Sequence, residues 1–335
     1  VKFNSSGVRQ WGTYYGGTTY DDGRSCATDT SGNVYLSGQT GSTSGIATTG
    51  AHQTTYGGGT YDAFLVKFNS SGVRQWGTYY GGTWSDYAYS CATDASGNVY
   101  LVGWTTSTSG IATTGAHQTL NGGELYDAFL VKFNSSGVRQ WGTYYGGTGR
   151  DDGSSCATDA SGNVYLAGRT KSTTAIATTG AHQTTYGGGS YDAFLVKFNS
   201  SGVRQWGTYY GGTETDYGYS CATDASGNVY LAGRTKSTTA IATTGAHQTT
   251  NGGGYYDAFL VKFDACPAVY SQDTITACDS YTWIDGVTYT LSDTTAKDTL
   301  LNAAGCDSIV SLNLTINYTQ TSTDSVVAND SCTWI

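Results

Sequence analysis

The sequence predicts an all-β protein, most of it a row of four-stranded antiparallel sheets that stack as the blades of a β-propeller. The first observation is that eighteen residues, VKFNSSGVRQWGTYYGGT, recur unchanged from Val1, Val66, Val131 and Val196. The second is the composition, with 48 Gly, 28 Tyr, one Pro and 12% charged residues, which favours strands and tight turns. The third is that no segment has sustained helical spacing of its apolar residues. We therefore expect almost no helix.

The repeat has a period of 65 residues. Residues 1–65, 66–130, 131–195 and 196–260 align without a gap, and a fifth copy starts at Val261 and ends after Phe263. We assign residues 1–265 to this array, with 261–265 as the partial copy. Comparison of the four copies leaves 15 variable positions of 65. An unbroken period of this kind indicates one supersecondary unit per repeat, stacked on its neighbours.

Each repeat contains four strand patterns, which in the second copy cover 89–95, 98–104, 127–134 and 138–145. They carry apolar residues on both faces, which is typical of strands buried on both sides. At this repeat length, such sheets are typical of propeller blades. The chain holds two strands of one blade, three whole blades and three strands of another. We therefore expect about four to five blades in an incomplete ring.

The motif DAFLVKFNSSGVRQWGTYYGG, followed by SCATDASGNVYLAGRT, resembles the bacterial β-propeller repeat family known as SBBP. The resemblance covers residues 1–264. It implies propeller modules of secreted or cell-surface bacterial proteins, and it implies no particular chemistry. The chain departs from the family pattern at four positions where the family tends to place an apolar residue: Cys26, Cys91, Cys156 and Cys221. Since packed sheets lie too far apart for disulfides, we expect these to be free thiols that fill the core.

A different pattern begins after Pro267. We assign 266–272 to a linker, 273–317 to a small β-sandwich-like module, and 318–335 to the start of a second copy, because DSVVANDSCTWI repeats DTITACDSYTWI. The module resembles a short repeat found in tandem near the ends of large secreted bacterial proteins. Cys278 and Cys306 are its predicted disulfide, because a module this small needs a covalent link. Cys266 and Cys332 stay unassigned. We expect a stalk or spacer.

Most differences between the copies fall at one end of the predicted blades, where strand a begins, strand b ends and strand c begins. Loops on a rigid scaffold are where binding residues concentrate, and aromatic and Arg side chains are common at binding hot spots. Neutral drift after duplication is the alternative explanation. The predicted ligand-binding face consists of Tyr20, Arg24, Trp84, Tyr87, Tyr89, Trp104, Arg150, Arg169, Lys171, Glu214, Tyr217, Tyr219, Arg234 and Lys236.

The repeated histidines and the aspartates of the a–b turns are predicted to have structural rather than catalytic roles. His52, His117, His182 and His247 sit in identical TGAHQT segments, and four equal copies do not supply distinct catalytic roles. Asp29, Asp94, Asp159 and Asp224 are expected to hold the a–b hairpins through backbone amides. We expect no cofactor. Weak calcium candidates, limited by the number of oxygen ligands, are Asp21, Asp22, Asp86, Asp151, Asp152 and Asp216.

The net charge of −9 and the pI near 4.7 argue against a nucleic-acid partner. The sequence has no run of 18 apolar residues, so we predict no membrane-spanning helix within it. We expect a piece of a larger secreted or surface protein with further repeats. Its predicted role is non-catalytic recognition or adhesion, with a surface glycan or protein as the ligand. One alternative is a polysaccharide hydrolase or lyase. Glu124 and Glu214 are the glutamates near the variable loops, and catalysis predicts a pocket that pairs Glu214 with Asp216 or Asp151. The other is a spacer without a ligand.

Overall fold

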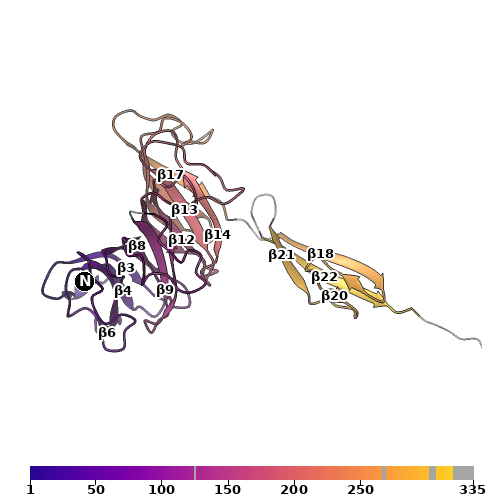
Figure 1. Cartoon of the computed structure of the whole chain (residues 1–335), viewed down its shortest axis with the longest axis horizontal. Helices are drawn as coiled ribbons and strands as arrows, with labels where there is room; N and C mark the ends of the chain where they lie inside the picture. The colour runs from indigo at the N-terminus through magenta and orange to yellow at the C-terminus, as the bar shows by residue number, and fades with distance from the viewer. Residues whose placement is uncertain (124–125, 266–268, 302–306, 320–335) are drawn as a thin grey trace, which may run out of the picture. The chain divides into compact units, whose positions relative to one another are not determined.

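The computed structural model of the protein describes residues 1–123, 126–265, 269–301 and 307–319 (Figure 1). These residues form strands joined by turns and loops, without a helix, and so within these ranges no helix is long and apolar enough to cross a membrane. The strands are β1 (Lys2–Phe3), β2 (Arg9–Trp11), β3 (Asp21–Thr28), β4 (Val34–Thr40), β5 (Asp62–Phe68), β6 (Arg74–Tyr80), β7 (Asp86–Thr93), β8 (Val99–Thr105), β9 (Asp127–Phe133), β10 (Arg139–Tyr145), β11 (Asp151–Thr158), β12 (Val164–Thr170), β13 (Asp192–Phe198), β14 (Arg204–Tyr210), β15 (Asp216–Thr223), β16 (Val229–Thr235), β17 (Asp257–Phe263), β18 (Val269–Cys278), β19 (Tyr281–Thr282), β20 (Thr288–Tyr289), β21 (Lys297–Leu301) and β22 (Asp307–Asn317).

The strands of Val1–Ala265, which form one compact unit, pair in chain order. Three complete antiparallel sheets have the orders β3-β4-β5-β6, β7-β8-β9-β10 and β11-β12-β13-β14. A two-stranded sheet, β1-β2, precedes them, and a three-stranded sheet, β15-β16-β17, follows. The predicted fold class and strand count are confirmed. The sheets do not close into a ring, and the N-terminus and β17 lie at opposite ends of the row in Figure 1.

The hairpins form where the repeated turn residues predict them. Asp94 accepts hydrogen bonds from the backbone amides of Ser96 and Asn98 through Oδ1, at 3.0 and 2.9 Å, and from the Asn98 side chain through Oδ2. Asn134 does the same for the c–d turn, with bonds from Ser136 and Val138. These side chains mimic a backbone turn, so the predicted role of the recurring Asp in the a–b hairpin is confirmed.

Adjacent blades share their cores, and the invariant strand c contributes buried side chains to each of them. Leu65 and Ala63 of β5 pack in one cluster with Cys91 and Leu101 of the next blade. The following two blade interfaces repeat this arrangement around Cys156 and Cys221. The last Tyr of strand d also crosses the seam, since Tyr80 donates a hydrogen bond of 2.7 Å to the Ile111 carbonyl. Burial on both faces explains why strand c is apolar at consecutive positions.

The four array cysteines are free thiols, as predicted, but they are not all buried. Cys91, Cys156 and Cys221 are buried, whereas Cys26 is exposed. The prediction was wrong for Cys26 because β3 belongs to the first sheet with four strands. Only the short hairpin β1-β2 precedes it, so no strand c covers Cys26 as β5 covers Cys91.

The second unit, Cys266–Ile335, is built around a mixed three-stranded sheet of order β18-β22-β21. Strand β18 pairs with β22 in parallel, and Trp283 packs with Leu312 and Leu314 in a small core. The predicted linker 266–272 was partly wrong. Strand β18 already begins at Val269, because its parallel pairing with β22 starts there, opposite Ser308, and 266–268 lie outside the described residues. Cys306 and most of 318–335 lie outside them too, so the Cys278–Cys306 disulfide stays a prediction.

Candidate functional site

The strand register places the variable segments at one end of the blades, which we call the variable end. In the third blade, Asp151 of β11 lies opposite Thr170, the last residue of β12, and Thr170 lies opposite Asp192, the first residue of β13. The starts of strands a and c and the end of strand b therefore coincide. The other end carries the invariant a–b and c–d turns.

A β-bulge in strand a directs one variable residue outward in every blade. The register between strands a and b shifts between Ala88 and Ser90, which leaves Tyr89 as the extra residue. A bulge of this kind re-aims side chains near a strand end. Strand b lies very close to strand a at this point, and only a glycine fits there. A Cβ on Gly103 would lie 1.7 Å from the Tyr87 carbonyl oxygen. The bulged residues of the four blades are Arg24, Tyr89, Ser154 and Tyr219.

Aromatic rings form the first half of a continuous series of contacts along the variable end. Tyr20 contacts Tyr61, with ring centroids 5.4 Å apart, and Tyr61 contacts Tyr87 of the next blade at 5.5 Å. Trp104 then stacks between two rings, at 4.0 Å from Tyr87 and 4.4 Å from Tyr126. Such stacking stabilises a ring pair by about 1 kcal/mol beyond burial. The series therefore links the first blade to the second.

Cationic side chains continue the series into the third and fourth blades. The guanidinium of Arg150 lies 4.1 Å from the ring centroid of Tyr126 and 5.8 Å from that of Tyr191. Arg169 lies 5.0 Å from Tyr191 and 4.9 Å from Tyr217 of the fourth blade. These are cation–π distances. In this part of the array, contacts between an aromatic ring and a guanidinium therefore join the blades, in place of the contacts between two rings.

The series ends in the fourth blade. The guanidinium of Arg234 lies 4.6 Å from Tyr217 and 4.1 Å from Tyr256, and the Lys236 ammonium lies 3.8 Å from Tyr255. We call the whole series the aromatic–cation ladder. Its members are Tyr20, Tyr61, Tyr87, Trp104, Tyr126, Arg150, Arg169, Lys171, Tyr191, Tyr217, Tyr219, Arg234, Lys236, Tyr255 and Tyr256.

One carboxylate fixes the two central arginines. Asp152 is buried and receives Nε of Arg150 at 3.2 Å and Nε of Arg169 at 2.6 Å on its two oxygens. Burial alone would lower the pKa of Arg169, but the Asp152 carboxylate outweighs it and the pKa is raised. The Arg169 guanidinium therefore stays charged, and the shared carboxylate holds both guanidiniums in place. In the first blade Asp22 pairs with Arg24 in the same way, at 2.7 Å.

The predicted face is thus only partly assembled into one surface. Twelve of its fourteen residues take part in ladder contacts or flank them. Trp84 is 60% exposed in the loop before β7, outside the ring and cation contacts of the described residues. Glu214 lies in the corresponding loop of the fourth blade, where its backbone amide donates to Ser237. The ladder does not include Trp84 or Glu214. Glu124 lies outside the described residues.

Five ladder residues escaped the sequence prediction, namely Tyr255 and the four tyrosines Tyr61, Tyr126, Tyr191 and Tyr256. Each of these four directly precedes strand c and is identical in every copy. Variation between copies was the criterion for the face, so invariant residues could not be found by it. The sequence feature that could have identified these tyrosines is their position, directly before the buried DAFLVKF strand in every copy. An invariant ring at the variable end provides the platform that each blade's variable residues contact.

The carboxylates at the start of strand a hold loops closed. Asp86 receives the Gly82 amide at 2.9 Å and the Ser107 hydroxyl at 3.0 Å, and the Thr105 hydroxyl donates to its other oxygen. Asp21 and Asp151 repeat all three bonds, and Asp216 repeats those from the glycine amide and the serine hydroxyl. Their neighbours are hydrogen-bond donors rather than the oxygen ligands a calcium ion prefers. The described residues contain no group of three His, Cys, Asp or Glu side chains able to hold a metal. Calcium binding stays an untested prediction.

A second set of buried carboxylates, at the start of strand c, was also missed. Asp127 accepts the Gly122 amide at 2.7 Å and the Gln118 side chain at 2.8 Å, while its other oxygen has no partner among the described residues. Burial raises the pKa of Asp127 to about 6 and that of Asp151, its neighbour from the next blade, to about 7. Asp62 and Asp86 form the same arrangement one seam earlier, and burial raises the pKa of each to about 7.

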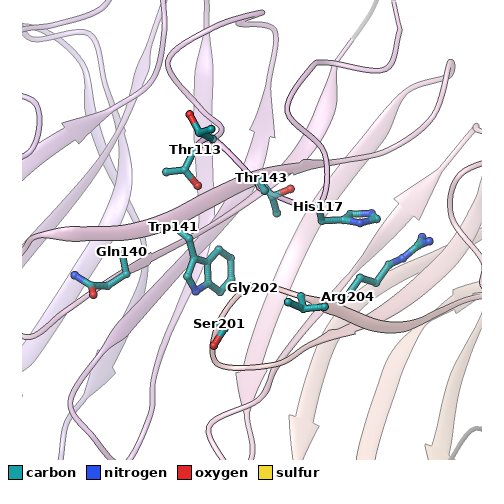
Figure 2. Close-up of a pocket in the computed structure, with 12 residues that line it drawn as sticks. Thr113, His117, Gln140, Trp141, Thr143, Ser201, Gly202 and Arg204 are labelled. Carbon is teal, nitrogen blue, oxygen red and sulfur yellow. The ribbon is translucent and has the colours of Figure 1, made fainter. Parts of the chain in front are cut away.

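A hollow beside one of the four repeated histidines lies away from the ladder. Figure 2 shows this pocket of about 420 Å³, lined by His117, Trp141 and Arg204 together with the invariant turn 201–203. His117 packs on Tyr145 and Phe198, and burial, assisted by the charge of Arg204, lowers its pKa to about 4. Trp141 donates to the Ser200 carbonyl at 3.1 Å. These contacts join two blades, as expected for a structural histidine.

Comparison with known families agrees with this geometry. The blades are those of a β-propeller, in which strands β3, β7, β11 and β15 contact one another in succession. The model of the SBBP family, a beta-propeller repeat, matches residues 10–45, 75–110, 140–173 and 205–238. The array is built of SBBP repeats. Each match starts in strand d and continues through strands a and b of the next blade. No curated protein matches the chain.

Proposed function

We propose that the array is a non-catalytic recognition scaffold of a secreted or cell-surface bacterial protein, and that it binds a glycan along the aromatic–cation ladder. The observation that carries this proposal is the continuity of the ladder across four blades. Scattered aromatic residues would suit a compact ligand, whereas a continuous series suits an extended one. Adhesion to a glycan-coated surface follows from this mode of binding.

The chemistry of the ladder supports a sugar polymer as the ligand. Tyr and Trp combine an apolar ring with a polar tip, so exposed edges such as those of Tyr20 and Tyr219 can contact sugar rings and hydroxyls together. The ring carbons of sugars pack on aromatic faces, and Arg and Lys donate to hydroxyl and carboxylate oxygens. The ladder cations, Arg150, Arg169, Lys171, Arg234 and Lys236, favour a glycan that carries acidic groups. A protein ligand is the alternative occupant.

Binding to a glycan array by the full chain, with surface plasmon resonance on the hits, tests this proposal. The variant Tyr20→Ala/Tyr219→Ala/Tyr255→Ala should lose at least tenfold in affinity, because each exposed aromatic contributes about 1–3 kcal/mol to stacking. The matched control is Val73→Ala/Val138→Ala/Val203→Ala, which removes similarly exposed side chains at the opposite, invariant end. Equal binding by both variants would contradict the ladder as the site. Absence of any glycan or surface binding by the folded wild type would favour a spacer.

A further inference from the structure

The two halves of the ladder differ in charge. In the first two blades the ladder contacts join one aromatic ring to another. In the third and fourth blades they join a ring to a guanidinium or an ammonium group. Arg24 of the first blade is already neutralised by Asp22, at 2.7 Å. The cations of the third and fourth blades are therefore the ones to compare as partners for an acidic ligand.

The third and fourth blades carry the same arginine but a different residue opposite it. Arg169 lies directly opposite Asp152 in the pairing of strands a and b, and its Nε donates to that carboxylate at 2.6 Å. Arg234 has the same position one repeat later and lies directly opposite Tyr217. A phenol ring therefore stands where the third blade has a carboxylate. This difference lies within one hairpin, so it does not depend on which blades flank it.

Arg234 lies against aromatic rings and keeps its hydrogen-bonding capacity free. Its guanidinium is 4.6 Å from the ring centroid of Tyr217 and 4.1 Å from that of Tyr256. Its Nε is buried and has no hydrogen-bond partner among the described residues, and the ion pairs within the same residues do not include Arg234. A guanidinium is a planar fork of donors that matches the oxygens of an acidic group.

Lys236 adds a second cation to the same place. Its ammonium group lies 3.8 Å from the ring centroid of Tyr255 and 5.1 Å from that of Tyr256, which therefore contacts both cations. Tyr255 is 74% exposed and Tyr219, on the other side of Arg234, is 44% exposed. The two cations thus lie beside rings that a ligand can reach.

The acidic side chains of the fourth-blade hairpin do not neutralise this pair in the described structure. Asp216 accepts the Gly212 amide and the Ser237 hydroxyl, as its equivalents do in the other blades. Glu214 is held by its backbone amide, which donates to Ser237, and its carboxylate forms no ion pair with the described residues. The nearest acids are therefore not internal substitutes for an acidic ligand.

We propose that Arg234 and Lys236 form the subsite that selects acidic sugars, while the ring-to-ring half of the ladder packs against sugar rings whatever their charge. This inference rests on the proposed function and adds a place and a direction, with the acidic part of the glycan over the fourth blade. The recognised group is a carboxylate or a sulfate ester. Because the chain has a net charge of −9, it repels polyanions elsewhere, so a preference for acidic sugars depends on these local cations.

Two variants of the full chain remove the subsite in different ways. Tyr217→Asp places a carboxylate opposite Arg234, as Asp152 stands opposite Arg169, and should bind the guanidinium internally. Tyr217→Asn is its control, because it removes the same ring without adding a charge. The second variant is Arg234→Gln/Lys236→Gln. Its control, Arg74→Gln/Lys297→Gln, removes one exposed Arg and one exposed Lys outside the ladder.

Surface plasmon resonance with two matched pairs of probes gives the readout. One pair is an oligogalacturonate and the same oligomer with its carboxyl groups reduced to alcohols, and the other is dextran sulfate and dextran. The wild type and both controls should bind the acidic member of at least one pair tenfold more tightly or better, and this preference should shrink as salt is added. Tyr217→Asp and Arg234→Gln/Lys236→Gln should lose the preference. The pair that shows it distinguishes carboxylate from sulfate.

The ratio of the two affinities within a pair separates this subsite from glycan binding in general. A wild type that binds acidic and neutral members equally would overturn the subsite and leave glycan recognition standing. A preference that survives in both variants, or that Tyr217→Asn loses as completely as Tyr217→Asp, would also overturn it. So would a wild type that binds none of the four probes, whereas the glycan array decides on glycan recognition itself.

Discussion

The two ends of the blades differ in how they use identical side-chain types. At the invariant end, Trp76, Trp141 and Trp206 lie in the seams, and the indoles of Trp76 and Trp141 each donate to a carbonyl of the next blade's turn. At the variable end, Trp84 is exposed and Trp104 lies in the ladder. The copied residues join blades, and the uncopied ones decorate a platform that the copied residues provide. The comparison shows that variation between copies identifies only some residues of the candidate site, because the site also contains residues that are identical in every copy.

The largest expected contrast is between two tryptophans. Trp141→Ala should lower the free energy of unfolding by about 3 kcal/mol, because it removes packing on Tyr100 and Phe198 and one of the two hydrogen bonds to the Ser200 carbonyl, which keeps only Lys132 as a donor. Trp84→Ala should change it by less than about 0.5 kcal/mol, since that ring is exposed. Urea unfolding followed by circular dichroism measures both. Similar losses for the two variants would contradict the distinction between the ends.

The pH dependence of stability tests the buried carboxylates that lie behind the variable end. A carboxyl whose folded pKa is raised stabilises the fold while it is protonated, so this contribution is lost as the pH rises from about 4 to about 7. Burial raises the pKa of Asp62, Asp86, Asp151 and Asp192 to about 7. Each contributes up to about 1 kcal/mol per pH unit in that window, so the melting temperature should fall between pH 5 and pH 8.

Two histidines oppose this trend. Burial lowers the pKa of His52 and His117 to about 4, which makes their contribution rise with pH between about 4 and 6.5. The carboxyls with raised pKa values outnumber these two histidines, so stability should still fall as the pH rises. Asp127→Asn imitates the protonated acid and should flatten the profile, because burial raises the pKa of Asp127 to about 6. A melting temperature that rises from pH 5 to pH 8 would show that these acids are ionised in the fold.

The smallest expected effect on stability concerns the centre of the ladder. Asp152→Asn should destabilise the array by about 1 kcal/mol, because Arg150 and Arg169 lose their shared charged partner. Its effect on ligand binding should exceed its effect on stability, because the two guanidiniums are no longer held in one geometry. Asp22→Asn, which frees the more exposed Arg24 in the first blade, is the matched comparison. Thermal denaturation and surface plasmon resonance on the same samples separate the two effects.

The sequence by itself determined the blades. A gapless period of 65 residues, turns such as TDASGN and NSSG, and strands apolar on both faces leave few other folds, because local hydrogen bonding and burial act in the same direction in every copy. It also placed the variable loops at one end, since an up-and-down sheet alternates its connections. The exposure of Cys26 was missed because sequence identity does not show which copy lacks a neighbour.

Only the tertiary structure decided what the variable residues contact. Tyr61 and Tyr87 are on different blades, and Arg169 reaches Tyr217 of the next blade, so neither contact follows from spacing within one repeat. The bulge that exposes Tyr89 and Tyr219 depends on the close approach of two strands at Gly103 and Gly233. The ladder arises because blades stack in register, which brings residues of adjacent blades into contact. That juxtaposition is a property of the stack rather than of any single copy.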